Sequence, residues 1–167
     1  MKVLGIDPGI ARLGWGVIRE TSNKQKIVAC GCLTTEKQIS DHQRLAYLFK
    51  QLQGLIKQYK PEIVAVEDLF FSSNAKTAFQ VGQARGIVLL AAALQGLPVV
   101  SYTPLKIKMT IVGYGRASKE QVQKMVNSML KLKVIPRLDD TIDALAVALT
   151  HCFLRKFEEK INNKFKY

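Results

Sequence analysis

Short apolar segments alternate with longer amphipathic ones along the chain, and the first three segments predict β-strands. They span Lys2–Ile6, Leu13–Arg19 and Lys26–Thr34, and only short polar turns, including Asp7-Pro8-Gly9, separate them. Connections this short favour antiparallel neighbours. The N-terminal region is therefore expected to form a three-stranded meander.

Helices and strands alternate after the meander. Apolar residues recur every three or four positions between Asp41 and Tyr59, which predicts a helix capped by Ser40 and stopped by Pro61. A fully apolar strand, a helix with Ala and Gly on one face, and a fifth strand follow, with predicted bounds Ile63–Val66, Asn74–Gln95 and Val99–Tyr102. Strand–helix–strand units require parallel pairing through right-handed crossovers.

Three further helices complete the pattern. Thr103 and Pro104 suit the cap and first position of one helix, and Ser118 with Gln121 has capping-box spacing at the start of the next. The second of these is expected to end near Lys131, and the last helix to run from about Asp139 past Phe153. The prediction is an α/β fold: a mixed five-stranded sheet, three antiparallel strands then parallel strands, with helices on both faces, as in ribonuclease-H-like folds.

Composition narrows the choice of partner. The 167 residues suit one domain, and 25 Lys and Arg against 13 Asp and Glu give a net charge of +12, which indicates a polyanion such as nucleic acid or an acidic membrane surface. The first apolar run ends at Asp7, and the longest, Ile87–Leu94, is far shorter than a bilayer span. We therefore expect a cytoplasmic protein without a signal peptide or a membrane segment.

Neither the three cysteines nor the C-terminal residues indicate a particular chemistry. Cys30, Cys32 and Cys152 have no zinc-like spacing and are expected to be packing residues in a reducing compartment. We predict one folded domain over residues 1–154 and a flexible basic C-terminal tail over 155–167. For this tail a frayed helix end and a nucleic-acid-binding arm both remain open.

Four acidic residues stand where a catalytic site is expected. Asp7 and Glu67 each follow an apolar strand, and Asp140 and Asp143 are three apart at the start of the last helix, hence on one face. If the first and fourth strands are neighbours, all four carboxylates meet at one edge of the sheet. Their mutual repulsion calls for cations. Two Mg²⁺ ions fit this oxygen-ligand set and the hydrolysis of a phosphodiester.

Each acid also has a simpler explanation. Asp7 suits a turn, Glu67 a solvated strand end, and either Asp139 or Asp140 a helix cap. Which of the two adjacent aspartates would bind metal is left open. Asp143 is the hardest to explain in this way, because an acid on an otherwise apolar helix needs a partner.

Four segments in order resemble the RuvC family of Holliday-junction resolvases over about residues 1–153. They are Gly5-Ile6-Asp7-Pro8-Gly9, Val66-Glu67-Asp68-Leu69-Phe70-Phe71-Ser72-Ser73-Asn74-Ala75, Gly82-Gln83-Ala84-Arg85-Gly86 and Asp140-Thr141-Ile142-Asp143-Ala144-Leu145-Ala146. The resemblance implies that Asp7, Glu67, Asp140 and Asp143 are catalytic and bind two Mg²⁺ ions, for which Mn²⁺ can substitute. It also implies a homodimer, here through the helix Asn74–Gln95, that cuts four-way junction DNA at two opposed strands, in bacteria together with a branch-migration motor.

The resemblance also assigns residues that contact DNA. Phe70 matches an aromatic that stacks on a base, although packing beside Phe71 is the alternative. Lys108 and Lys119 match basic residues near the cleaved strand, and Arg85 and Lys76 are further expected contacts. Any of these lysines could instead be an ordinary solvated side chain.

Three other functions share some of these sequence features. A general ribonuclease-H-like nuclease acting on RNA–DNA hybrids or flaps would use the same carboxylates, so they do not exclude it. The actin-like ATPase and sugar-kinase group needs two such domains, for which 167 residues are too few. A non-catalytic junction-binding protein would bind DNA without cutting and would tolerate Asp7→Asn.

Overall fold

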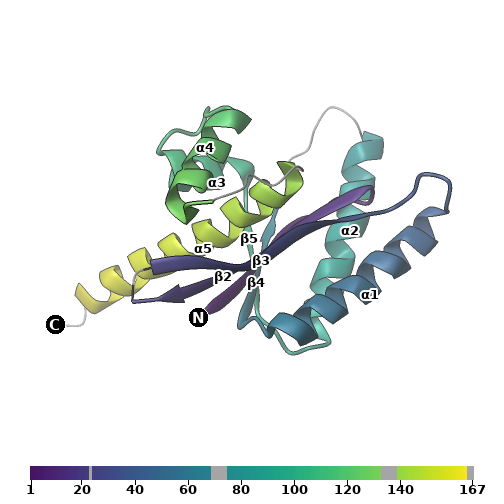
Figure 1. The fold of residues 1–167 in the computed structure, drawn as a ribbon, viewed down its shortest axis with the longest axis horizontal. Helices are drawn as coiled ribbons and strands as arrows, with labels where there is room; N and C mark the ends of the chain where they lie inside the picture. The colour runs from purple at the N-terminus through teal and green to yellow at the C-terminus, as the bar shows by residue number, and fades with distance from the viewer. Residues whose placement is uncertain (23, 69–74, 133–138, 165–167) are drawn as a thin grey trace.

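The predicted mixed sheet is present. The computed structural model describes residues 1–22, 24–68, 75–132 and 139–164, with the side chains of 75, 76 and 156–164 left out. Five strands pair in the order β3-β2-β1-β4-β5 (Figure 1). Their bounds are Lys2–Asp7 for β1, Arg12–Thr21 for β2, Lys24–Thr34 for β3, Ile63–Glu67 for β4 and Val99–Tyr102 for β5. Pairing is antiparallel among β1, β2 and β3 and parallel for β1–β4 and β4–β5.

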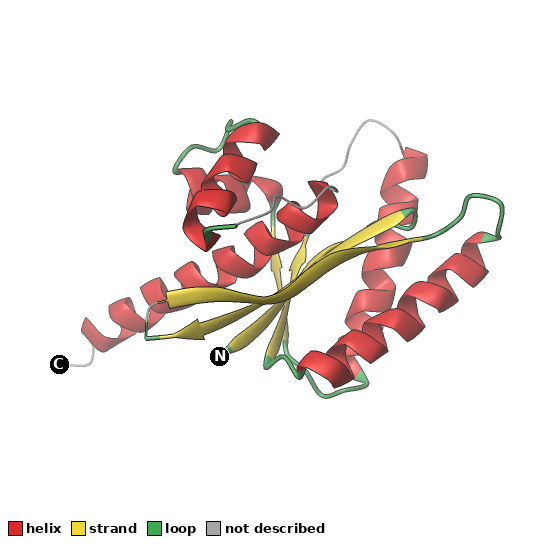
Figure 2. Ribbon diagram, in the orientation of Figure 1, coloured by secondary structure: helices red, strands yellow, loops and turns green. Residues whose placement is uncertain are grey.

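Two helical layers cover opposite faces of the sheet (Figure 2). One layer holds α1, Asp41–Tyr59, and α2, Ala75–Ala93; the other holds α3, Pro104–Val112, α4, Lys119–Leu130, and α5, Asp139–Lys164. Alternating strand residues divide between two cores: Val3 packs with α5, whereas Leu4 packs with α1 and α2. This alternation is the two-residue period of a strand buried on both faces.

Several predicted bounds are wrong by a few residues. The β2–β3 hairpin continues to the pair Thr21–Lys24, because backbone pairing persists through polar residues that a hydrophobic pattern does not register. Helix α2 ends at Ala93 rather than Gln95, where a tight turn leads to Gly96 with φ of 65°.

The predicted caps are confirmed for two helices and wrong for one. Thr103 accepts a hydrogen bond from the backbone N–H of Lys106, and Ser118 and Gln121 form a full capping box. Ser40 occupies the N-cap position of α1, but its hydroxyl caps no backbone group. It donates to the Gln43 side chain at 2.8 Å instead.

Helix α5 lies unusually close to the sheet because glycines face it. A Cβ on Gly5 would clash with the carbonyl oxygen of Ala144, and a Cβ on Gly14 would clash with that of Asp140. Only glycine permits this approach of two backbones. The start of α5 is thereby seated directly on β1 and β2.

The far part of α5 is also attached to the sheet. Arg155 binds the buried Glu20 carboxylate of β2 at 2.9 Å, and the helix continues to Lys164. The backbone of the predicted basic tail is therefore helical through Lys164; the predicted domain boundary at residue 154 stays a prediction.

None of the helices in the described ranges combines the length and apolar character needed to cross a bilayer. The three cysteines are free thiols.

Candidate active site

The ends of two parallel neighbours, β1 and β4, place the first two acids. Asp7 is the last residue of β1, opposite Gly14, and Glu67 is the last residue of β4, opposite Tyr102. The start of α5, seated on Gly14, brings Asp140 and Asp143 over the same edge. The predicted convergence of the four carboxylates therefore rests on strand order and on the close approach of one helix.

Asp7 is the electrostatic centre of this cluster. Burial, followed by the charges of Glu67, Asp143 and Asp140, raises the pKa of Asp7 to about 8. Asp7 is hydrogen-bonded to Glu67, and this bond raises the pKa of Asp7 while it lowers that of Glu67. The two carboxyl groups therefore share one hydrogen bond and titrate as an interacting pair.

The pKa values of Glu67 and Asp143 are also raised. Burial raises the pKa of each carboxyl, and the charge of Asp143 adds to the effect on Glu67. Lys119 opposes both shifts, and its Nζ lies 2.8 Å from Asp143 Oδ2. Burial disfavours the Lys119 ammonium, but the bond to Asp143 and the neighbouring acids outweigh it and raise the Lys119 pKa. The partner that the sequence required for Asp143 is thus Lys119.

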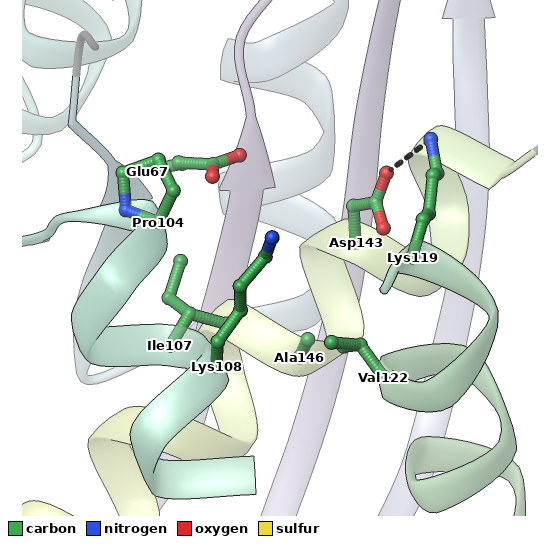
Figure 3. A pocket seen from close by; sticks show the side chains of 8 residues that line it. All are labelled: Glu67, Pro104, Ile107, Lys108, Lys119, Val122, Asp143 and Ala146. Carbon is green, nitrogen blue, oxygen red and sulfur yellow. Dashed lines mark ion pairs between the residues drawn. The ribbon is translucent and has the colours of Figure 1, made fainter. Parts of the chain in front are cut away.

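A pocket of about 240 Å³ opens beside these groups (Figure 3). Glu67, Asp143 and Lys119 line it together with Lys108, which extends from α3 toward the acids. The rest of the lining is apolar and consists of Pro104, Ile107, Val122 and Ala146. Two acids and two lysines in one hollow suit a bound phosphate with its counter-ions.

The two adjacent aspartates of α5 differ in their surroundings. The Asp140 side chain is 17% exposed and its charge acts on Asp7, whereas that of Asp139 is 61% exposed and lies 3.7 Å from Lys119. Asp140 thus faces the carboxylate cluster and Asp139 faces solvent.

Arg12, the first residue of β2, was not predicted to belong to the site. Its Nε lies 3.2 Å from Asp140 Oδ2. The thiol of Cys32 on β3 responds to the same groups: burial and then Asp140 raise its pKa, and Arg12 lowers it. Nothing in the sequence marks Arg12, but Gly14 and Gly16, two apart in a strand, signal the close approach of the helix that carries Asp140.

The donor set suits a divalent cation, although the carboxylates are not gathered around one point. Within the described part of the chain, no three His, Cys, Asp or Glu side chains lie close enough together to hold a metal ion. Asp140 Oδ2 is nevertheless buried without a hydrogen-bond donor, an arrangement that is costly for a carboxylate oxygen. A carboxylate oxygen with an unsatisfied lone pair is the kind of ligand that a divalent cation takes.

The other residues predicted to contact DNA are Arg85, Lys76 and Phe70, and the structure describes the side chain of Arg85 only. Arg85 donates to Ser101 Oγ at 2.8 Å and pairs with Asp68 at 3.3 Å, so it joins α2 to the ends of β4 and β5. Lys76 lies in the first turn of α2, but its side chain is outside the described atoms. Phe70 and its neighbours through Asn74 lie outside the described residues.

Comparison with known proteins identifies the family. The model of the family "Crossover junction endodeoxyribonuclease RuvC" matches residues 3–151. The enzyme of that name from Roseiflexus sp. is 49% identical over 162 residues, 95% of this chain and 96% of the relative. The structure of Thermus thermophilus RuvC in complex with a Holliday junction substrate is 38% identical, with a TM-score of 0.89 over 95% of this chain and 96% of that chain.

A more distant structure shares the fold alone. The yeast mitochondrial Holliday junction resolvase Ydc2 is 14% identical, with a TM-score of 0.61 over 95% of this chain and 85% of that chain.

The family match begins in β1 and ends within α5, and so includes every strand and all four acids of the cluster. On this span and these identities, the chain belongs to the RuvC family of crossover junction endodeoxyribonucleases.

Proposed function

We propose that this protein resolves four-way DNA junctions by paired symmetric nicks, with two Mg²⁺ ions held by Asp7, Glu67, Asp140 and Asp143. Family membership makes it an endodeoxyribonuclease that acts on crossover junctions. The observation that carries the proposed metal chemistry is the proximity of three other carboxylates to Asp7, whose pKa burial and their charges raise to about 8. Such a concentration of negative charge in a basic protein favours divalent cations as its partner.

The acidic side chains of the site would bind metal, and its lysines would bind the substrate. The four carboxylates would hold the ions, with Asp140 rather than Asp139 as the ligand because only Asp140 is directed into the cluster. When bound, the metal supplies charge stabilisation on the attacking and leaving oxygens of phosphodiester hydrolysis. Lys108 and Lys119, which line the same pocket, would hold the scissile phosphate next to the acids.

The second subunit would dock on α2. An exposed stripe on this helix contains Phe79, Gly86 and Leu90, and it continues to Leu94 just beyond the helix end. A Cβ on Gly86 would meet nothing within 4 Å, so this position leaves room for a neighbouring backbone. A two-fold dimer through α2 would present two active sites to the two opposed strands of a junction.

A cleavage assay tests the proposal. Synthetic four-way junction, matched linear duplex and RNA–DNA hybrid are each incubated with the protein in Mg²⁺, in Mn²⁺ or in EDTA. We expect paired nicks at symmetric positions in the junction alone and only with metal. Cleavage of the duplex or the hybrid would instead indicate a general nuclease. Tight binding of the junction without cleavage would indicate a non-catalytic junction-binding protein.

The carboxylate assignment has its own test. Asp143→Asn is expected to reduce cleavage by at least about 100-fold while junction affinity is kept, because a lost metal ligand impairs chemistry but not the basic surface. Asp139→Asn is the matched control and should cut like wild type. Normal cleavage by Asp143→Asn would rule out this site.

A further inference from the structure

Arg12 reaches the acidic cluster from a different element than the two lysines do. Lys108 and Lys119 reach the acids from α3 and α4, whereas Arg12 reaches Asp140 from the beginning of β2. Among the described residues, Asp140 is the sole ion-pair partner of Arg12. Asp140 therefore has a counter-ion distinct from Lys119, which pairs with Asp143.

The contact between the two side chains is one of charge rather than a formed hydrogen bond. Arg12 Nε lies 3.2 Å from Asp140 Oδ2, yet that oxygen accepts no hydrogen bond. The Arg12 side chain is 55% exposed, so water and salt screen the attraction. A divalent cation can therefore displace the guanidinium at little cost.

Asp140 has little freedom to avoid this competition. Its backbone carbonyl is pressed against Gly14, two residues after Arg12 on the same strand. The carboxylate can rotate, but its backbone stays beside β2. A metal ion and the guanidinium thus compete for the same Oδ2 atom, and their like charges oppose joint occupancy.

We propose that Arg12 is a built-in counter-ion of Asp140 that competes with divalent metal and so raises the metal concentration the enzyme requires. The inference rests on the proposed function, because it takes Asp140 as a metal ligand. Arg12 acts here as a positioning residue: it neutralises and orients Asp140 until metal takes its place. Removal of Arg12 should therefore strengthen metal binding, which is the opposite of what loss of a purely structural residue would do.

The test measures metal uptake without DNA. Mn²⁺ is titrated calorimetrically into the full-length wild-type protein and into Arg12→Gln, Arg12→Lys and Arg19→Gln. Arg19 is an exposed arginine on the same strand, so its variant controls for the loss of one positive charge. We expect Arg12→Gln to bind Mn²⁺ roughly two- to fivefold more tightly than wild type, the effect of losing a partly exposed ion pair. Arg12→Lys and Arg19→Gln should stay near wild type.

The outcomes separate this inference from the proposed function. Equal Mn²⁺ affinity in Arg12→Gln and wild type, or the same gain in Arg19→Gln, overturns the role of Arg12 if Asp143→Asn still weakens uptake. Uptake that is undetectable in wild type, or unchanged in Asp143→Asn, counts against the metal site itself. Thermal melts in EDTA provide a second readout: Arg12→Gln should lower the melting temperature of wild type but not that of Asp140→Asn. A similar loss in both backgrounds would mean that Arg12 acts through other contacts.

Discussion

The Asp7 side chain is buried, which disfavours its charged form, yet the proposed metal site needs that negative charge. Its pKa is about 8 in the folded protein against 3.8 for an ordinary aspartate. Above pH 4 the unfolded chain releases this proton, while the folded protein retains it until about pH 8. The stability linked to Asp7 is therefore full below about pH 4 and falls progressively as the pH rises to about 8.

Replacement of Asp7 by Asn should remove this pH dependence. In EDTA at pH 8, Asp7→Asn is expected to melt above wild type by about 2–4 °C for each kcal/mol recovered, and the difference should vanish near pH 4. Differential scanning calorimetry across this range measures it. Glu36→Gln, a change in an exposed loop carboxylate, is the control. A wild-type melting temperature that is constant from pH 5 to 8 in EDTA would contradict the interpretation.

At the scale of elements, the position of α5 decides whether the site forms. Gly14→Ala would force its new methyl group against the Asp140 carbonyl, so the start of α5 must lift from the sheet. We expect a destabilisation of about 1–3 kcal/mol, as for other overpacked positions, with a larger loss of cleavage than of junction binding. Urea unfolding and the junction assay measure the two effects.

Gly54→Ala is the matched control for this change. Gly54 lies within α1, and a Cβ there would meet nothing within 4 Å. Alanine should therefore stabilise the helix by roughly 0.5–1 kcal/mol and leave cleavage unchanged. If both glycine variants behave alike, the seating of α5 does not control the site.

The elements also show what the sequence could predict. The bounds of α1 and β5 and the division into three antiparallel and then parallel strands follow from periodicity and connection length, and all are confirmed. Asp7 and Glu67 were predictable as neighbours only on the condition that β1 and β4 pair, which the structure meets. The pairs Arg12–Asp140 and Lys119–Asp143 were not, because such contacts depend on how closely α5 and α4 pack, which hydrophobic patterning does not specify.

At the scale of the whole molecule, the exposed stripe on α2 should determine the oligomeric state. Leu90→Glu places a charge on a half-exposed apolar position, so it should disrupt a dimer without opening the core. Sedimentation velocity is expected to show a folded monomer, and the junction assay single nicks instead of paired ones. A monomeric wild-type protein, or a dimeric Leu90→Glu variant, would exclude this interface.

The net charge of +12 predicts how the molecule meets DNA. Junction affinity should fall steeply with salt, because bound phosphates release their counter-ions. Lys108→Gln should reduce the slope of log K against log salt by about 1 if Lys108 contacts one phosphate. Fluorescence anisotropy over a salt series measures both, with Lys57→Gln on the remote helix α1 as control. An unchanged slope in Lys108→Gln would remove this residue from the DNA contacts.

The contact of α5 with Gly5 and Gly14 also limits which amino-acid changes this chain can accept. At both positions the nearest obstacle to a side chain is a backbone oxygen, which no mutation elsewhere can delete or shorten. A strain with alanine at either codon should therefore regain activity mainly by true reversion, whereas defects in side-chain packing admit many second-site suppressors. A library for engineering this enzyme should keep these two codons invariant.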